Sequence, residues 1–164
     1  MNRFVIELDD FKYPKQQLFD YQDNNPAYEA NIHFKSGYGY DTAKESKFFD
    51  LNGSECKEAN KLVASLGLEE YKFTKVLAGG AMPAHIDPQR DAVLMLPLTD
   101  EPSPIVYYEN SVEVFRHTYT KPTIINAKIK HGVPVVTRDR IFLQINLHDP
   151  WNEIYKRFSR NRSK

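Results

Sequence analysis

The sequence predicts a mainly β fold, a sandwich or jelly roll with flanking helices. Strand patterns follow one another between residues 71 and 147, and turn-forming Pro, Gly and Asn residues separate them. Helical patterns fall outside this region, so strands and helices do not alternate as they would in a parallel α/β sheet. A chain of 164 residues suits a single domain, residues 1–164, that can bury a substantial core.

The N-terminal part, residues 1–67, is predicted to support that core. Phe4–Leu8 reads as a short strand, and Pro14–Gln22 suits a short helix because proline is tolerated at the first helical position. The chain that follows contains Asn, Pro and Gly residues and predicts an irregular segment. Within it, residues 33–48 are either a lid over a binding site or disordered, and both interpretations stay open here.

Two further helices are predicted. Ser54–Leu66 has a suitable N-cap in Ser54, apolar residues at helical spacing, and Gly67 where a glycine often ends a helix. The second covers residues 149–159, with Asp149 as its cap. Its apolar residues form one stripe, which should pack on the outside of a sheet: Trp151, Ile154, Tyr155 and Phe158.

The core strands are predicted between residues 71 and 147. Ala92–Leu98 is an apolar run, as expected for a strand that is buried on both faces. Arg140–Leu147 alternates strictly between apolar residues and a second set that includes Phe142, as expected for a half-buried strand. Glu109-Asn110-Ser111 suits a tight hairpin turn. The remaining strand patterns are Tyr71–Leu77, Ile105–Tyr108, Val112–His117 and Thr123–Ala127.

Composition excludes several classes of protein. Lysine plus arginine equal aspartate plus glutamate, at 22 each, which argues against a dedicated nucleic-acid binder. Cys56 is the only cysteine, so no intrachain disulfide can form. The sequence shows neither a signal peptide nor an apolar run of membrane length. We therefore expect a soluble, cytoplasmic protein that does not bind membranes; its oligomeric state cannot be derived from these patterns.

A metal-binding pattern stands out against this background. His85-Ile86-Asp87 places a histidine and a carboxylate two residues apart, so in an extended segment both side chains point the same way. His131 then has to come from a distant strand that folds back over the first. Two histidines and one carboxylate with open positions opposite form the facial triad of non-heme Fe(II) oxygenases.

Arg140 adds a second chemical feature. An arginine in the middle of a half-buried strand, on the same face as Phe142, is costly to bury unless it meets an anion. Its planar guanidinium suits a carboxylate. A site with these two features could bind a dicarboxylic keto acid, chelated by the metal at one end and paired with Arg140 at the other.

His85-x-Asp87, His131-Gly132-Val133 and Arg140 together resemble the Fe(II)/2-oxoglutarate-dependent oxygenase superfamily. Within it, the chain is most similar to small single-domain members that are prolyl hydroxylase-like or aspartyl/asparaginyl hydroxylase-like. The resemblance implies a double-stranded β-helix, a jelly roll of the cupin-like kind, as the core. It also implies that His85, Asp87 and His131 are catalytic residues that hold Fe(II), and that Arg140 anchors 2-oxoglutarate. The resemblance further implies that dioxygen is the second cosubstrate and that ascorbate is a possible additional cofactor.

The chain departs from the family pattern in one place. Many members carry a serine or threonine two residues after the arginine, where this chain has Phe142. Arg138 on the same strand face could then share the role of Arg140, which is favoured because it should lie deeper. Asn126 and Tyr108 are further candidates for contact with the cosubstrate, and structural roles are the alternative for both. Either Tyr107 or Tyr108 must face inward, because adjacent strand residues point to opposite faces. Arg90 suits either a solvated loop or an anionic substrate.

The leading functional hypothesis is a dioxygenase that hydroxylates an amino-acid or peptidyl side chain. Neutral charge and small size favour a peptide, protein or amino-acid substrate over a nucleobase. The main alternative is a cupin-like metal-binding protein or isomerase without oxygenase activity, because a fold does not determine a function. A third is a non-catalytic interaction module. A buried Arg140 discriminates between the first two, since metal binding alone does not require it.

Overall fold

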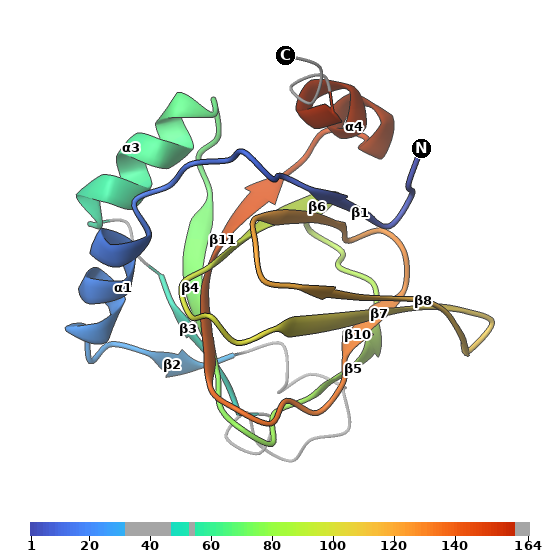
Figure 1. Ribbon diagram of the computed structural model, residues 1–164, viewed down its shortest axis with the longest axis horizontal. Coiled ribbons are helices and arrows are strands. Elements are labelled where there is room, and N and C mark those ends of the chain that lie inside the picture. Colours follow the sequence, from blue (N-terminus) through green and yellow to red (C-terminus); the bar gives the residue numbers. More distant parts are fainter. Residues whose placement is uncertain (32–46, 53–54, 160–164) are drawn as a thin grey trace.

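A computed structural model, which describes residues 1–31, 47–52 and 55–159, shows two antiparallel sheets (Figure 1). Among these residues the larger sheet has seven strands, in the order β1 (Val5–Glu7), β9 (Thr123–Asn126), β6 (Ala92–Pro97), β11 (Arg140–Leu147), β4 (Tyr71–Val76), β3 (Phe48–Leu51) and β2 (Glu29–Ala30). The smaller has four, in the order β5 (Met82–His85), β10 (His131–Val133), β7 (Ser103–Glu109) and β8 (Val112–Tyr119). The predicted mainly β jelly-roll fold is confirmed.

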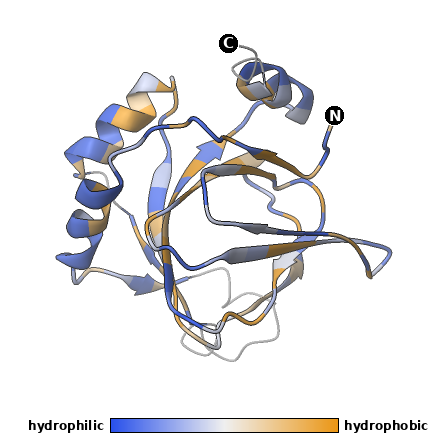
Figure 2. Cartoon of the chain, in the orientation of Figure 1, coloured by the Kyte–Doolittle hydropathy of each residue, from blue (hydrophilic) through white to orange (hydrophobic). Residues whose placement is uncertain are grey.

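Helices cover the outer face of the larger sheet, as predicted. They are α1 (Lys15–Asp23), α3 (Lys57–Ser65) and α4 (Trp151–Ser159). Apolar residues of β11, such as Leu143 and Ile145, share one buried cluster with Leu18 of α1, Val63 of α3 and Ile154 of α4. The hydropathy colouring shows hydrophobic residues concentrated on the strands and hydrophilic stretches along the helices (Figure 2). Full burial of each large apolar side chain stabilises the fold by about 1.5–3 kcal/mol.

The inner face of β11 contributes to a second core between the sheets. Phe142 lies in one buried cluster with Val93 and Met95 of β6 and with Ile105 and Tyr107 of β7. Every residue of β6 is buried, because this strand has the helices on one side and the smaller sheet on the other. The prediction that the apolar run at Ala92–Leu98 is a strand buried on both faces is therefore confirmed.

The structure differs from the sequence-based expectation in several elements. The short strands β5, β2 and β3 were not predicted, and β10 was expected only as a strand carrying His131 without bounds, because Pro and Gly residues interrupt or flank these patterns. Helix α3 begins at Lys57 with Cys56 as its N-cap, and the predicted cap Ser54 lies outside the described residues. Residues 33–46 of the predicted lid or disordered segment also lie outside them, whereas Phe48 begins β3. None of the described helices is both long and apolar enough to span a membrane.

The hairpin turn between β7 and β8 was predicted correctly. Asn110 and Ser111 both have left-handed backbone conformations, with φ of 49° and 65°. Two consecutive left-handed residues give the tight turn whose twist matches that of the flanking strands. Gly67 also has a left-handed φ of 65°, directly after the C-cap of α3, as its position in the sequence predicted.

Candidate metal centre

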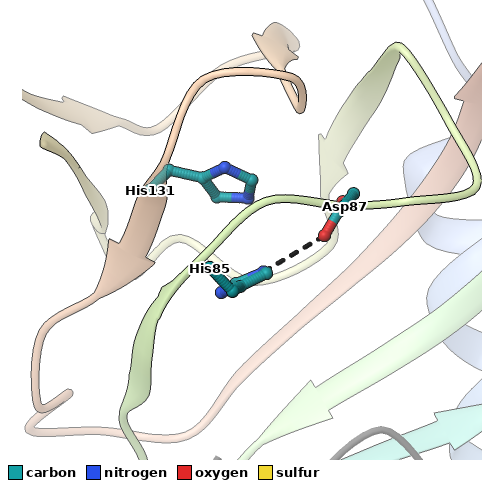
Figure 3. Close-up of side chains that lie close together, drawn as sticks. All are labelled: His85, Asp87 and His131. Atoms are coloured by element: carbon teal, nitrogen blue, oxygen red, sulfur yellow. Dashed lines mark ion pairs between the residues drawn. The ribbon is translucent and has the colours of Figure 1, made fainter. Parts of the chain in front are cut away.

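The two predicted histidine ligands are brought together by the pairing of β5 with β10. His131 is the direct partner of His85 in this antiparallel pair, and their ring centroids lie 4.5 Å apart. Asp87 follows two residues after the end of β5, and its backbone N–H donates to the carbonyl oxygen of Ala127 at 3.1 Å. Figure 3 shows the three side chains converging from these two segments. The expectation that His131 comes from a strand folded over the first ligand pair is confirmed.

Gly132 allows β10 to approach β5 this closely. A Cβ atom at this position would lie 2.8 Å from the carbonyl oxygen of Met82 and 3.2 Å from the backbone nitrogen of Ala84. Both neighbours are backbone atoms, which cannot rotate away as the end of a side chain can. Glycine is therefore required next to His131 for the pairing that sets the ligand geometry.

The geometry of the three side chains fits a divalent metal ion. His85, Asp87 and His131 each offer one ligand atom, and these atoms lie within 4.8 Å of one another. Nδ1 of His85 lies 2.8 Å from the carbonyl oxygen of Pro83, and Nδ1 of His131 lies 2.8 Å from that of Ile129. Because a carbonyl oxygen only accepts, Nδ1 carries the proton in both rings and Nε2 is left to bind a metal.

His85 provides a further argument for a cation. Its Nε2 lies 3.1 Å from Oδ1 of Asp87, while its Nδ1 already faces the carbonyl oxygen of Pro83. A neutral imidazole has only one N–H, so it cannot donate to both oxygens. With its proton on Nδ1, His85 presents the Nε2 lone pair toward Oδ1 of Asp87, which is the arrangement that a metal ion bound to both atoms requires. The donor set of two imidazoles and a carboxylate is the one that non-heme iron uses.

The protonation states of the other two ligands suit metal binding. Burial, together with the charge of His85, lowers the pKa of His131 to about 4, so its imidazole is neutral at physiological pH. Burial raises the pKa of Asp87, but hydrogen bonding by His85 and the charge and hydrogen bond of Arg90 outweigh it and lower that pKa overall. Asp87 is therefore an anionic ligand beside a neutral one.

Arg90 is the neighbour of this centre that the sequence did not assign. Its Nε donates to Oδ2 of Asp87 at 2.6 Å. Its Nη1 donates to the side-chain oxygens of Gln144 at 2.8 Å and Asn146 at 3.0 Å, both on β11. The interpretation as a solvated loop arginine is wrong, because its side chain is 19% exposed and is held by three acceptors. The sequence did not reveal this role, since two of its three partners come from a strand far along the chain.

Two residues of the triad, His85 and Asp87, line a cavity of about 170 Å³ with a mostly polar wall. The wall continues the hydrogen bonds of Arg90: Gln144 donates to Thr74, and Thr74 donates to Asp50, each at 2.9 Å. Lys72 also donates to Asp50, at 2.9 Å. The lining residues described are Asn31, Phe48, Lys72, Thr74, Met82, His85, Asp87, Pro88, Gln89, Arg90, Gln144 and Asn146.

Arg140 is buried on the inner face of β11, as the alternation predicted, but it does not line this cavity. It is 2% exposed, and its Nε has no hydrogen-bond partner among the described residues. Burial lowers the pKa of its guanidinium, and the nearby Tyr119 hydroxyl opposes that shift. It lines a separate cavity of about 220 Å³, and Phe142 lies between it and Gln144 on the strand face. Its distance to a metal-bound cosubstrate stays a prediction.

Tyr119 and Ser103 are polar residues beside Arg140 that the sequence analysis missed. The two are direct partners in the β7–β8 pair, both are buried, and the serine hydroxyl hydrogen-bonds the phenol. Burial raises the pKa of Tyr119 to about 12, so its hydroxyl is a neutral donor at physiological pH. Tyr119 lies near Arg140 from the smaller sheet, so its hydroxyl adds a polar group beside the buried guanidinium.

Two other candidates, Arg138 and Asn126, make other contacts in the structure. Arg138 precedes β11, is 74% exposed on its side chain and pairs with Glu101 at 3.0 Å. The side-chain amide of Asn126 is used by backbone groups, donating to the carbonyl of Arg3 and accepting from the N–H of Lys128. For Arg138 and Asn126 the structural interpretations hold instead.

Tyr108 is corrected by the register of β7. Tyr107 is the direct partner of His131 and its ring lies 5.8 Å from the imidazole, so its neighbour in the strand points to the other face. The hydroxyl of Tyr107 donates to the backbone carbonyl of Phe4 at 2.8 Å, which leaves the ring as a packing surface for His131.

The sequence and the structure were compared with those of known proteins, and only the structure has counterparts. No family model matches the sequence, and no curated protein matches it. Among solved structures, the chain is similar to a prolyl-4-hydroxylase from Pseudomonas putida, with a TM-score of 0.60, 11% identity, and coverage of 88% of this chain and 91% of that one. It is also similar to a 2OG-Fe(II) oxygenase family oxidoreductase from Burkholderia pseudomallei, with a TM-score of 0.54, 13% identity, and coverage of 80% and 76%. The predicted resemblance to the 2OG-Fe(II) oxygenase fold is confirmed.

Proposed function

We propose that the protein is a non-heme Fe(II)- and 2-oxoglutarate-dependent dioxygenase that hydroxylates an amino-acid or peptidyl side chain. The observation that carries this proposal is the convergence of His85, Asp87 and His131 within 4.8 Å in a fold shared with 2OG-Fe(II) oxygenases. These three residues would hold the iron. When bound, iron and 2-oxoglutarate supply an oxidation in which dioxygen is consumed and the keto acid is decarboxylated to succinate.

Arg140 supports the part of the proposal that concerns 2-oxoglutarate. A buried guanidinium whose Nε has no partner is costly unless an anion joins it. A carboxylate from the cosubstrate would satisfy Arg140, and the Tyr119 hydroxyl is a neutral donor for the same carboxylate. Phe142 on the same strand face would keep water from weakening that ion pair.

The cavity at the triad supports a small polar substrate. Its volume of about 170 Å³ is below the roughly 300–1,000 Å³ of pockets that enclose drug-sized ligands, so it suits a single side chain. Its wall includes the ammonium group of Lys72, whose three N–H donors exceed its one bond to Asp50 and could orient a carboxyl or amide group of an amino acid or peptide.

A succinate-release assay tests the proposal. The protein is loaded with Fe(II) and 2-oxoglutarate, with and without ascorbate, and offered panels of peptides, free amino acids and oligonucleotides. Hydroxylated product together with succinate, from the peptide or amino-acid panel, is the expected result. Turnover of oligonucleotides alone would overturn the substrate class, and tight metal binding without any 2-oxoglutarate binding would overturn the oxygenase.

One observation favours a second candidate function. Arg140 lines a different cavity from the triad, so the two halves of a cosubstrate site do not share one wall in this structure. A cupin-like metal-binding protein or isomerase needs only the triad and its cavity. Isothermal titration with 2-oxoglutarate and with a non-oxidising divalent metal separates the two candidates, because only the oxygenase binds both.

A further inference from the structure

Arg90 contacts one oxygen of the metal-ligand carboxylate and leaves the other free. Its Nε donates to Oδ2 of Asp87 at 2.6 Å, while Oδ1 lies 3.1 Å from Nε2 of His85, on the side of the triad. A carboxylate can bind a metal through one oxygen or through both. With Oδ2 engaged by a guanidinium, Asp87 offers only Oδ1 to an ion held between the histidines.

The guanidinium of Arg90 is itself fixed by two amide oxygens on β11. Nη1 donates to Gln144 at 2.8 Å and to Asn146 at 3.0 Å. The two acceptors lie two residues apart on one face of β11, so both can accept a hydrogen bond from Nη1 of Arg90. Rotation of the Arg90 side chain would break three hydrogen bonds at once, and hydrogen bonds to a charged group are stronger than those between neutral groups.

Further hydrogen bonds decide which way the two amides point. The nitrogen of the Gln144 amide donates to Thr74 at 2.9 Å, and the Thr74 hydroxyl uses its single proton on Asp50 at 2.9 Å. The nitrogen of the Asn146 amide donates to Glu70 at 3.0 Å. Because each amide nitrogen has an acceptor on its far side, each amide oxygen must face Arg90.

We propose that Arg90 is a positioning residue that restricts Asp87 to one-oxygen coordination and so keeps a coordination position of the metal open for cosubstrate or dioxygen. The inference rests on the metal centre of the proposed function and does not need the 2-oxoglutarate site. Its role is orientation: the guanidinium acts on the metal only through Asp87.

Charge alone predicts the opposite effect on metal affinity. Arg90 is a cation next to a site for another cation, so its removal would strengthen metal binding if repulsion dominated. Orientation predicts weaker binding, since removing an outer-shell partner of a ligand typically costs about 10–100-fold in metal affinity. The sign of the change therefore separates the two roles.

Cobalt(II) is a suitable probe because its visible absorption reports the number of ligands. We expect Arg90→Met to weaken Co(II) binding by about 10–100-fold, and to change the spectrum as Asp87 becomes a two-oxygen ligand. Arg90→Lys keeps the charge but cannot span Asp87, Gln144 and Asn146, so it should resemble Arg90→Met rather than the wild type. Arg138→Met is the matched control, because it removes an exposed guanidinium that pairs with Glu101 and makes no contact with Asp87 among the described residues.

Asn146→Leu gives an independent test if Arg90→Met does not fold, as judged by thermal melting. It leaves Arg90 in place and removes one of its two amide acceptors, so the affinity loss should be smaller and the spectral change in the same direction. Unchanged or tighter Co(II) binding with an unchanged spectrum in the variants of Arg90 would overturn the inference alone. Absence of Co(II) binding by the wild type would overturn the proposed metal centre as well.

Discussion

The imidazole of His131 lies against that of His85, with ring centroids 4.5 Å apart and an angle of 54° between the planes. This proximity follows from their position as direct partners in the β5–β10 pair. The remaining ligand, Asp87, is tied to the same place by its backbone bond to Ala127 and by Arg90. Substitutions at these positions should therefore have separable effects on metal binding and on folding.

Loss of one ligand should abolish tight metal binding. His131→Ala is expected to raise the Kd for Co(II) or Fe(II) by more than the roughly 100-fold that removal of an outer-shell partner causes. The measurement is a metal titration followed by absorption or calorimetry. His148→Ala is the control, because that histidine is half exposed and pairs with Glu70. Equal affinities for His131→Ala and the wild type would rule out the triad.

Arg140 and Arg138 should differ sharply in their effect on 2-oxoglutarate. We expect Arg140→Ala to weaken binding of the keto acid by about 3–5 kcal/mol, because one partner of a buried ion pair is lost. Arg140→Lys should recover only part of this, because the planar fork is absent. Arg138→Ala should have no effect, since its side chain is 74% exposed. Calorimetry with Mn(II) in place of iron checks all three, and the reverse order would reassign the anchor to Arg138.

In the absence of 2-oxoglutarate, the buried guanidinium of Arg140 should lower the free energy of unfolding of the protein. Its guanidinium is 2% exposed and its Nε has no partner among the described residues. Arg140→Met replaces this buried charge with an apolar side chain of similar length and should raise Tm by a few degrees, corresponding to about 1 kcal/mol. Saturating 2-oxoglutarate should stabilise the wild type and leave this variant unchanged. If Arg140→Met, loaded with metal but without 2-oxoglutarate, had a lower Tm than the wild type, the guanidinium of Arg140 would not be destabilising in the absence of the cosubstrate.

Tyr119 should contribute to the anchor as a hydrogen-bond donor. Burial raises the pKa of its hydroxyl to about 12, so it can donate to a carboxylate throughout the physiological pH range. Tyr119→Phe is expected to weaken 2-oxoglutarate binding by about 1.5–3 kcal/mol while leaving Co(II) affinity intact. Ser103→Ala should cause a smaller loss, because Ser103 acts through the phenol. Unchanged calorimetric affinity in Tyr119→Phe would show that the Tyr119 hydroxyl does not donate to the carboxylate that Arg140 is proposed to bind.

Gly132 should couple backbone packing to metal affinity. Gly132→Ala brings a Cβ to 2.8 Å from the carbonyl oxygen of Met82, so β5 and β10 must separate. We expect a loss of about 1–3 kcal/mol in stability, as in other overpacked sites, together with weaker Co(II) binding. Gly67→Ala is the matched control: its φ of 65° makes it costly, but no atom lies within 4 Å of the added Cβ and the site is remote. Thermal melts and metal titrations of both variants separate the effects.

The metal ligands and the fold could be predicted because their signals are local. His85 and Asp87 lie two residues apart, and Arg140–Leu147 alternates without a break, so the face of each side chain follows from strand geometry. The buried run at β6 and the stripe of α4 likewise report their surroundings directly. Each of these patterns depends on the spacing of a few neighbouring residues.

The residues that could not be predicted depend on strand register. Arg90 is recognised only once Gln144 and Asn146 are placed opposite it, and Tyr119 only once β8 is placed across from Arg140. The short strands β5 and β10 have too few residues for an alternation to be visible. Tyr107 and Tyr108 were indistinguishable in the sequence, because adjacent strand residues differ only in the face that the register assigns to them.

The direct pairing of His85 with His131 would also link metal binding to folding. An ion shared by these residues would tie together two segments with the whole β7–β8 hairpin between them in the chain. A covalent link closing a loop of comparable length stabilises a protein by about 4 kcal/mol, through its effect on the unfolded ensemble. β5 and β10 are only four and three residues long, so a bound ion would contribute much of the stability of their pairing, and this contribution would be lost when the ion dissociates. Removal of the metal by a chelator should therefore increase amide hydrogen exchange in β5 and β10 first. These strands should also become susceptible to proteolysis before the larger sheet unfolds.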